Sequence, residues 1–464
     1  MTIELRKSVS TRTTPITLVD RTSLPAVAAR LPAATQRWLR SIGFVGAADR
    51  HVLLPDEQGQ MAQVLAGIGD IDDPFALAAL PGDLPPGDYR LSDDGLALDP
   101  AIAAHSWHMG SYAFDRYKPR RRTTARLLLP SGATARRGLA IAEALTLARD
   151  LINTPAEHLG PQELAGAAQA LAKAHGARFK QIVGDELLKK NFPAIHAVGR
   201  ASVRAPRLIE LQWGKPSHPR VSIVGKGVCF DSGGLDIKGA DGMRLMKKDM
   251  GGAANALGLA AMVMALKLPL RLQVLIPAVE NAIAGNAYRP GDVLPTRAGL
   301  QIEIGNTDAE GRVILSDALA YAAESTPELI IDLATLTGAA RIALGPQLPA
   351  LFCRDMRTAR TLVDLGLELQ DPLWHMPLWA PYKAGIESSV GDIVNTGRNA
   401  MAGAINAALF LEYFVPPDQD WLHVDLFGWN DAPRAGRPVG GEAQTIRTLL
   451  AYLEQRFAGP AARG

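Results

Sequence analysis

The sequence is poor in cysteine and carries almost no net charge. Cys229 and Cys353 are the only cysteines among 464 residues, so a disulfide framework is excluded and a reducing cytosol is the expected environment. Lys and Arg number 49 and Asp and Glu 47, which gives a formal charge of +2. This balance argues against a protein whose main role is to coat nucleic acid or an anionic membrane.

A long uninterrupted apolar run is also missing. The most apolar stretch, residues 253–270, contains Asn255 and Lys267 and falls short of the roughly 20 apolar residues that span a bilayer, so we interpret it as a core helix. The N-terminus, MTIELRKSVSTRTT, has no apolar core of signal-peptide length. We therefore expect a cytoplasmic protein without a membrane span. Hydrophobic residues still make up 47% of the chain, which excludes a largely disordered one.

The chain divides into two regions of different character. Residues 1–125 have short apolar runs between Pro, Gly and Asp clusters, which is typical of a small N-terminal α/β domain. Residues 136–153 have helical apolar spacing and end before Pro155, so we expect a linker helix. In residues 154–464 apolar strands alternate with helical segments, which predicts a larger C-terminal α/β/α domain with a mixed, mostly parallel central sheet.

The larger domain has five clear strand patterns and five clear helix patterns. Strands are expected at 208–213, 221–225, 272–279, 329–334 and 421–428, and helices at 161–175, 251–268, 311–324, 400–414 and 441–457. Strands that read as continuous Val, Ile and Leu are buried on both faces. Sheets of this kind bind ligands at the carboxyl ends of their strands, so the residues that follow each strand are the first candidates for a site.

Three common catalytic signatures, HExxH, CxxC and GxSxG, do not occur in the sequence. Residues 224–234 contain glycines after a strand but lack the ending of a phosphate-binding loop. His105 and His108 form an HxxH pair, which we interpret as packing or surface histidines. The usual signatures therefore identify no site.

Acidic residues gather where predicted strands end. Lys226 and Asp231 lie at the end of one strand, and Asp249 lies at the start of a helix. Asp308 and Glu310 lie at a strand-to-helix turn. Each acidic residue alone is explained by the preference of such residues for helix N-termini. Together in one crevice they would repel one another unless cations offset them, and two divalent metals such as Mg, Mn or Zn would do so.

Six short strings accompany these residues. They are NTPAE (153–157), VGKGVCFDSGG (224–234), DMGGAA (249–254), PGDV (290–293), NTDAEGR (306–312) and DLATLTGA (332–339). NTDAEGR matches letter for letter the signature of the leucyl aminopeptidase family, and the other strings have the separations of that family. The chain thus resembles this family of two-metal exopeptidases over residues 150–455, and more weakly through GSYAFDRYK (110–118). The resemblance implies a metallopeptidase catalytic domain in residues 154–464.

The resemblance also implies two divalent metal ions per subunit, Mn²⁺ or Zn²⁺. Their expected ligands are Lys226, Asp231, Asp249, Asp308 and Glu310. In the family pattern Asp231 and Glu310 would bridge the ions. Asp308 would serve the first ion, and Lys226 and Asp249 the second. A lysine ligand must be neutral, and two neighbouring dications or burial can lower its pKa enough.

Two catalytic residues are implied as well. Lys238 is expected to stabilise the oxyanion of the tetrahedral intermediate, with a solvated loop lysine as the alternative. Arg312 is expected to hold a bicarbonate that acts as general base toward a water activated by the two metals, with a salt bridge at a helix start as the alternative. The expected reaction is attack of that water on the peptide carbonyl, which releases the N-terminal amino acid.

The substrate pocket and the assembly follow from the same resemblance. Met246, Thr335 and Gly338 are expected to line the pocket for the first side chain, with ordinary core packing as the alternative for Met246. A Met-lined pocket is deformable, so leucine and other apolar side chains are the expected preference. The free amino group of the substrate would bind the second metal, which makes the enzyme an aminopeptidase. The expected partners are peptides with a free N-terminus and, in a homohexamer, further copies of the chain.

Two features stand apart from the family pattern. Lys247 and Lys248 directly precede Asp249, where familiar members have at most one basic residue, and we expect them to contact solvent or substrate. A basic run raises DNA binding as an alternative function; it contains Arg116, Lys118, Arg120, Arg121, Arg122 and Arg126. The near-neutral net charge favours a solvated linker over a DNA-binding surface.

Overall fold

The computed structural model describes residues 2–7, 13–119 and 125–457. Its internal contacts divide the chain into two units. Unit 1 consists of the residues up to Thr146 together with Ala432–Val439. Unit 2 consists of Leu147–Asp431 and the residues from Gly440 onward. The division falls within helix α5 (Ala133–Asn153), which covers the helix expected at 136–153.

In its described residues, unit 1 has a six-stranded sheet in the order β1-β6-β5-β2-β4-β3, parallel throughout except where β3 joins β4. Its core surrounds Trp107 and Tyr89, both fully buried. The strands are β1 (Ile3–Arg6), β2 (Thr14–Val19), β3 (His51–Pro55), β4 (Met61–Gly67), β5 (Asp88–Leu91) and β6 (Arg126–Pro130). The helices besides α5 are α1 (Leu24–Ala29), α2 (Ala33–Ser41), α3 (Leu80–Asp83) and α4 (Pro100–Ser111).

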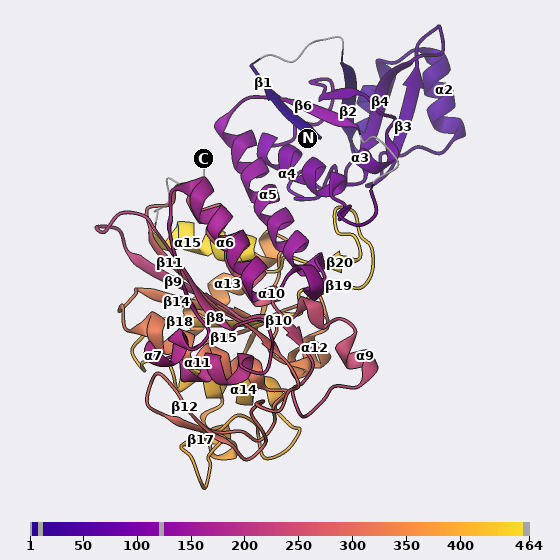
Figure 1. Cartoon of the computed structure of the whole chain (residues 1–464). Coiled ribbons are helices and arrows are strands. Elements are labelled where there is room, and N and C mark those ends of the chain that lie inside the picture. The colour runs from indigo at the N-terminus through magenta and orange to yellow at the C-terminus, as the bar shows by residue number, and fades with distance from the viewer. Residues whose placement is uncertain (1, 8–12, 120–124, 458–464) are drawn as a thin grey trace. The chain divides into compact units, whose positions relative to one another are not determined.

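The described residues of unit 2 form a nine-stranded sheet in the order β16-β15-β18-β14-β9-β11-β8-β7, with β10 beside β11 (Figure 1). Neighbours from β18 to β11 are parallel, whereas β8, β7 and β15 join antiparallel. The strands are β7 (Arg178–Val183), β8 (Arg207–Trp213), β9 (Arg220–Gly225), β10 (Gly227–Asp231), β11 (Arg271–Asn281), β14 (Leu329–Ala334), β15 (Ala350–Cys353), β16 (Trp374–Met376) and β18 (Trp421–Asp425).

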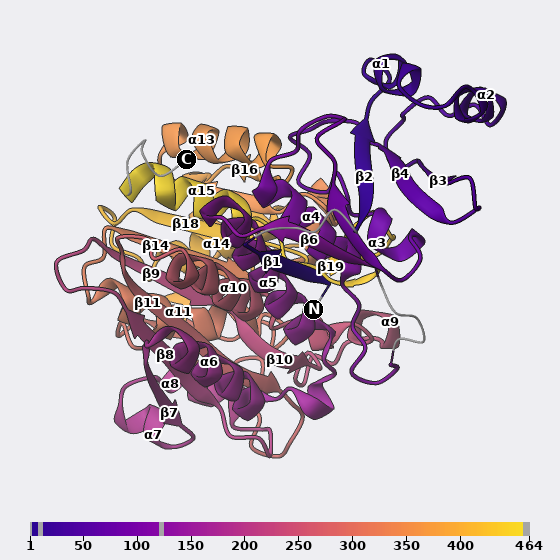
Figure 2. The same cartoon turned by 90° about the horizontal axis from the view of Figure 1, so that it is seen from above.

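Helices cover both faces of this sheet (Figures 1 and 2). One face carries α6 (Pro161–His175), α10 (Gly251–Ala265), α13 (Met356–Glu368) and α15 (Ile446–Phe457). The other carries α8 (Pro193–Gly199), α11 (Glu310–Ala323) and α14 (Gly403–Glu412). Smaller elements are η1 (Ala156–His158), α7 (Glu186–Lys189), α9 (Ala240–Met243), η2 (Met246–Lys248), β12 (Val293–Pro295), β13 (Gln301–Glu303), α12 (Gly338–Leu344), η3 (Ala380–Gly385), β17 (Ile393–Val394), β19 (Trp429–Asn430) and β20 (Gly440–Gly441).

This architecture confirms the expected fold class, a small N-terminal α/β domain and a larger C-terminal α/β/α domain with a mixed, mostly parallel sheet. The apolar stretch expected to be a core helix is α10, which is buried from Gly251 to Met264. No helix in the described ranges combines the length and the apolar character that crossing a membrane requires. The parallel order matters for the site because it brings the carboxyl ends of β9, β10 and β14 to one edge.

Some predicted element ends are wrong, and the backbone shows why. The helix expected at 441–457 begins only at Ile446, because Gly440 and Thr445 have φ values of 138° and 66°, which helices do not accommodate. The helix expected at 251–268 ends at Ala265, and Lys267 follows with a φ of 54°. Such left-handed residues stop a helix even though the apolar pattern continues.

Candidate metal centre

The acidic residues singled out from the sequence sit at one edge of the unit 2 sheet. Asp231 is the last residue of β10, and Lys226 joins β9 to β10. Asp249 lies between η2 and α10. Asp308 precedes α11, and Glu310 is its first residue. Strand ends and helix starts therefore deliver all five side chains to the same region.

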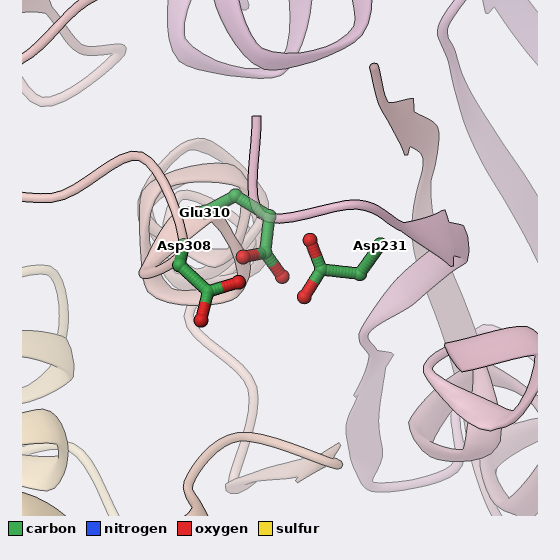
Figure 3. Close-up of side chains that lie close together, drawn as sticks. All are labelled: Asp231, Asp308 and Glu310. Atoms are coloured by element: carbon green, nitrogen blue, oxygen red, sulfur yellow. The ribbon is translucent and has the colours of Figure 1, made fainter. Parts of the chain in front are cut away.

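Three of these carboxylates converge. Asp231, Asp308 and Glu310 each offer an oxygen, and these atoms all lie within 4.8 Å of one another. Figure 3 shows the three carboxylates pointing toward a common centre. Asp231 and Glu310 are 2% and 1% exposed, so water does little to screen their repulsion. This geometry suits a small cation with oxygen ligands.

Two lysines reach into the cluster. The Lys226 nitrogen lies 2.7 Å from Asp249 Oδ2 and 3.0 Å from Glu310 Oε1, so it joins the fourth carboxylate to the other three. The Lys238 nitrogen lies 2.8 Å from Asp231 Oδ2 and also contacts Asp308 Oδ1. Among the described residues, two ammonium groups thus form ion pairs with four buried or half-buried carboxylates.

The pKa values reflect this imbalance. Burial, followed by repulsion from Asp231, raises the pKa of Glu310 to about 8 and that of Asp308 to about 6. For Lys226, burial favours the neutral amine, but the surrounding carboxylates outweigh burial and raise its pKa. The four carboxylates therefore need more positive charge than Lys226 and Lys238 supply.

Some of the carboxylate oxygens receive no hydrogen bond from the described residues. Both oxygens of Glu310 are buried without a hydrogen bond from any described residue, although Lys226 lies close to one of them. The helix-capping alternative does not hold within the described residues. Met250 and Ala309 occupy the N-cap positions of α10 and α11, and neither helix has a side-chain cap. Buried, clustered and uncapped oxygens fit divalent metal ions.

Glycine at two positions lets the cluster form. A Cβ at Gly311 would lie 2.6 Å from the Cε of Lys226, so only glycine lets the lysine stem pass the start of α11. Gly233 has a φ of 88°, and a Cβ there would lie 2.4 Å from the Asp236 carbonyl oxygen and 3.0 Å from Asp308 Oδ1. These contacts explain the glycines in the DSGG and AEGR strings.

Several supporting residues were not identified from the sequence. The Asn281 side-chain amide donates to Asp231 Oδ1 at 2.9 Å and to the Thr307 carbonyl at 3.0 Å. Tyr288 donates to the same carbonyl at 2.6 Å. Asn281 could have been identified from the sequence, because it lies at the end of a strand, β11, as Asp231 lies at the end of β10.

Arg312 lies two residues into α11 and is buried. It donates from Nη1 to the Asn395 carbonyl at 2.8 Å, and no described residue accepts a hydrogen bond from its Nε. Burial lowers its pKa to about 10, although Glu310 and Asp425 oppose the change. It has no ion pair within 4 Å in the described residues, so the salt-bridge alternative is not supported.

The residues expected to line the substrate pocket occupy different settings. Thr335 donates from Oγ1 to Asp249 Oδ1 at 2.8 Å, so it contacts a proposed ligand directly. A Cβ at Gly338, the first residue of α12, would meet no atom of the described residues within 4 Å. Met246, the first residue of η2, is half-buried, so it is not an ordinary core residue. The pocket assignment stays a prediction.

The two lysines before Asp249 differ from each other. Lys247 donates to the Asn153 carbonyl at 2.7 Å and lies over the Trp429 ring. Lys248 is only 6% exposed, and its nitrogen lies 4.7 Å from the centre of the Phe427 ring. Burial lowers the pKa of Lys248 to about 8. The sequence predicted that these lysines contact either solvent or substrate. For Lys248, the prediction of a solvent contact is therefore wrong.

The other polar motifs lie in unit 1. His108 hydrogen-bonds Thr146 at 3.1 Å, and His105 packs edge-on against Phe75, which agrees with packing histidines. In the basic run, Arg126 pairs with Asp88 at 2.8 Å and with Glu4 at 3.2 Å. Arg120, Arg121 and Arg122 lie outside the described residues. The described contacts of Arg126 are structural and do not support DNA binding.

Two family models match the chain. The model described as "Cytosol aminopeptidase family, catalytic domain" matches residues 146–450, and "M17 aminopeptidase, N-terminal domain" matches residues 14–130. The "Probable cytosol aminopeptidase" of Roseiflexus castenholzii is 43% identical over 364 residues, 74% of this chain and 74% of that protein. The matches cover both units.

Solved structures show the same likeness. The cytosol aminopeptidase from Coxiella burnetii has a TM-score of 0.92 and 49% identity over 97% of this chain and 98% of its own. The bottromycin maturation enzyme BotP, solved in complex with Mn, has a TM-score of 0.86 and 33% identity over 96% of this chain and 99% of its own. The chain therefore belongs to the cytosol aminopeptidase family and is a metal-dependent aminopeptidase.

Proposed function

We propose that the protein releases N-terminal amino acids, with leucine and other apolar residues preferred, using two divalent ions, Mn²⁺ or Zn²⁺. The observation that carries this proposal is the convergence of the buried Asp231 and Glu310 with the half-buried Asp308. No described residue donates a hydrogen bond to Glu310. The BotP structure with Mn supports manganese as one choice.

The proposed ligands are Asp231, Asp249, Asp308, Glu310 and Lys226. When bound, the ions activate water, polarise the scissile carbonyl and take the substrate's free amino group as a ligand. The charge of the ions would also favour the neutral amine of Lys226, which the carboxylates alone oppose. Asn281 fixes the orientation of Asp231, and Thr335 fixes that of Asp249.

Two cations of the chain would act on the reacting atoms. Lys238 is 16% exposed at its side chain and lies against Asp231 and Asp308, so its ammonium can donate to the oxygen that gains charge as the carbonyl is attacked. Arg312 has a buried Nε without a partner among the described residues, which fits the proposed binding of bicarbonate as general base.

The pocket for the first side chain would be formed by Met246, Thr335 and Gly338. The open space at Gly338 provides room, and the flexible Met246 adapts to different apolar side chains. We also propose a cytoplasmic homohexamer; the names of the cytosol aminopeptidase relatives support the location.

A matched pair of substrates tests the function. The metal-loaded protein is given Leu-Gly-Gly and acetyl-Leu-Gly-Gly, and free leucine and acetyl-leucine are separated by chromatography. The free peptide should be cleaved orders of magnitude faster, because an acetylated nitrogen is a poor metal ligand and positioning contributes several kcal/mol. Equal rates would replace the aminopeptidase with an endopeptidase or an acylamino-acid hydrolase.

A further inference from the structure

Lys248 is a buried cation next to the metal centre, and it forms no ion pair with a described residue. Only 6% of the residue is exposed, and its ammonium lies against the face of Phe427. Within the described part of the chain, no carboxylate comes within ion-pair distance and no acceptor forms a hydrogen bond with it. A charged group in this setting loses most of its hydration, and the ring contact together with the more distant charges of Asp249 and Asp425 only partly replaces it.

A second cation contacts the same ring. The guanidinium carbon of Arg341 lies 4.9 Å from the centre of Phe427, and Arg341 also has no ion pair with any residue whose position the structure gives. Arg341 is three residues beyond Gly338 on α12, so the two lie on the same helix face. Arg341 and Phe427 line a narrow cleft together with Thr337 and Asp425.

The nearby carboxylates are already engaged. Asp425 accepts hydrogen bonds from the Leu336 and Thr337 amides at 3.0 and 3.2 Å and from Thr337 Oγ1 at 2.6 Å. Asp249 lies 2.7 Å from the Lys226 nitrogen and is a proposed metal ligand. Neither forms an ion pair with Lys248 or Arg341. The two cations therefore share one aromatic ring, and neither forms an ion pair with a residue in the described ranges.

These cations border the pocket proposed for the first side chain. Lys248 is on the same short turn, η2, as Met246. Phe427 lies between Leu426 and Gly428, and both of these residues come within 4 Å of a Cβ built at Gly251, as does Thr335. Met246 thus shares a turn with Lys248, Gly338 shares a helix with Arg341, and Thr335 lies near the two residues that flank Phe427.

We propose that Lys248 and Arg341 bind a carboxylate at the end of the substrate's first side chain, so that the protein releases N-terminal glutamate as well as apolar residues. This inference rests on the proposed function, in which Met246, Thr335 and Gly338 line the pocket. The methylenes of glutamate contact the apolar wall, and its carboxylate supplies the charge that the two cations lack. A carboxylate bound between an ammonium and a guanidinium forms charge-assisted hydrogen bonds.

Three p-nitroanilides of similar side-chain size separate charge from shape: those of glutamate, glutamine and leucine. The metal-loaded protein should turn over the glutamate compound with kcat/KM at least about tenfold above that for glutamine, because one charge-assisted pair is about twice as strong as a neutral hydrogen bond. An apolar pocket would give the reverse order. A glutamate-to-glutamine ratio below one would overturn the inference.

Matched variants assign the effect to the two cations. In Lys248→Met the glutamate-to-glutamine ratio should fall at least about tenfold. Lys247→Met, the same change one residue away, should leave the ratio unchanged because Lys247 is hydrogen-bonded to the Asn153 carbonyl. Arg341→Met provides a second variant at an exposed site, which tests the inference if Lys248→Met fails to fold.

The possible outcomes are distinct. A ratio that is the same in Lys248→Met or Arg341→Met as in the parent protein would remove the cations from substrate recognition. Failure of the parent protein to turn over any of the three compounds would instead contradict the proposed aminopeptidase function. Turnover of leucine alone would keep that function and overturn the acidic preference.

Discussion

Helix α11 carries two buried acidic residues in opposite situations. Glu310, at its start, belongs to the carboxylate cluster, and neither of its oxygens accepts a hydrogen bond from a described residue. Asp317, two turns further, is fully buried and accepts three backbone N–H bonds, from Ala194 and Ile195 at 2.9 and 3.2 Å and from Arg297 at 2.8 Å. Burial alone therefore does not mark a functional carboxylate; Glu310 differs from Asp317 because no described residue donates a hydrogen bond to it.

Asp332 on β14 is a third buried carboxylate, and its situation differs from those of Glu310 and Asp317. Its two oxygens are each 2.6 Å from a ring nitrogen, Trp421 Nε1 and His423 Nδ1, and all three residues are buried. Its partners are side chains, and one of them titrates. The three carboxylates should consequently differ in what a mutation changes: metal and turnover at Glu310, stability at Asp317, and pH dependence at Asp332.

The largest effect is expected from Glu310→Gln. The amide keeps the shape but removes the charge, so the protein should lose bound metal, and kcat/KM should fall by about 10³-fold or more. Metal charge stabilisation contributes several kcal/mol, and about 1.4 kcal/mol corresponds to a tenfold rate change. Metal analysis and turnover with a leucyl substrate measure both. Asp308→Asn should behave alike, and near-normal turnover in a metal-replete assay would refute the ligand assignment.

Lys238→Ala should come next in size. A donor that acts mainly on the oxyanion contributes a rate effect of about 10²–10³-fold, so kcat should fall far more than KM rises. Metal content should stay at the parent level. If one metal were lost, Lys238 would be a ligand, and a change confined to KM would make it a substrate-binding residue.

Asp317→Ala should change stability and not chemistry. Three buried N–H groups lose their acceptor, and the free energy of unfolding should fall by about 3 kcal/mol. Urea denaturation of the metal-loaded protein measures the change, and kcat per folded molecule should stay near the parent value. Asp317→Asn, which retains one acceptor oxygen, is the milder control. If Asp317→Ala kept the stability of the parent protein but lost turnover, Asp317 would have a functional role and not a structural one.

The smallest effect concerns His423. Burial lowers its pKa, but Asp332 outweighs burial, so its pKa is raised above the ordinary value of 6.5. The pair's contribution to stability is thus fully present below pH 6.5 and is lost as pH rises through the raised pKa, at no more than about 1.4 kcal/mol per pH unit. Thermal unfolding from pH 6 to 9 should show the gap between the parent and His423→Gln narrowing. A gap that widens with pH would contradict the charged pair.

Much of this arrangement was predictable from sequence, but unevenly. Apolar runs such as 221–225 and 329–334 become β9 and β14, because central parallel strands are buried on both faces and read as continuous hydrophobic segments. The edge strand β7, with the pattern RFKQIV, was not predicted because none of its residues is fully buried and it has little apolar signal. Periodicity thus recovers the centre of the sheet better than its edges.

The candidate site shows the same unevenness. Asp231 and Glu310 were identifiable because they follow strands or begin helices within short strings. Asn281 and Asn395 support the site, but each comes from a segment that is far away in the sequence. Neither segment has a pattern that predicts which other segments it will contact. The burial of Lys248 was likewise unpredictable, because it depends on Phe427, a residue distant in the chain.

The open space at Gly338 has a consequence for how readily this enzyme can be altered. Alanine is the better helix former at an ordinary helical position, so a methyl group at 338 would be expected to strengthen α12. It would also project into the space that we assign to the substrate's first side chain. Glycine at position 338 therefore makes α12 less stable but leaves space for the substrate's first side chain. Position 338 is therefore a single adjustable point at which pocket depth can be reduced stepwise, from alanine to valine, without touching a metal ligand.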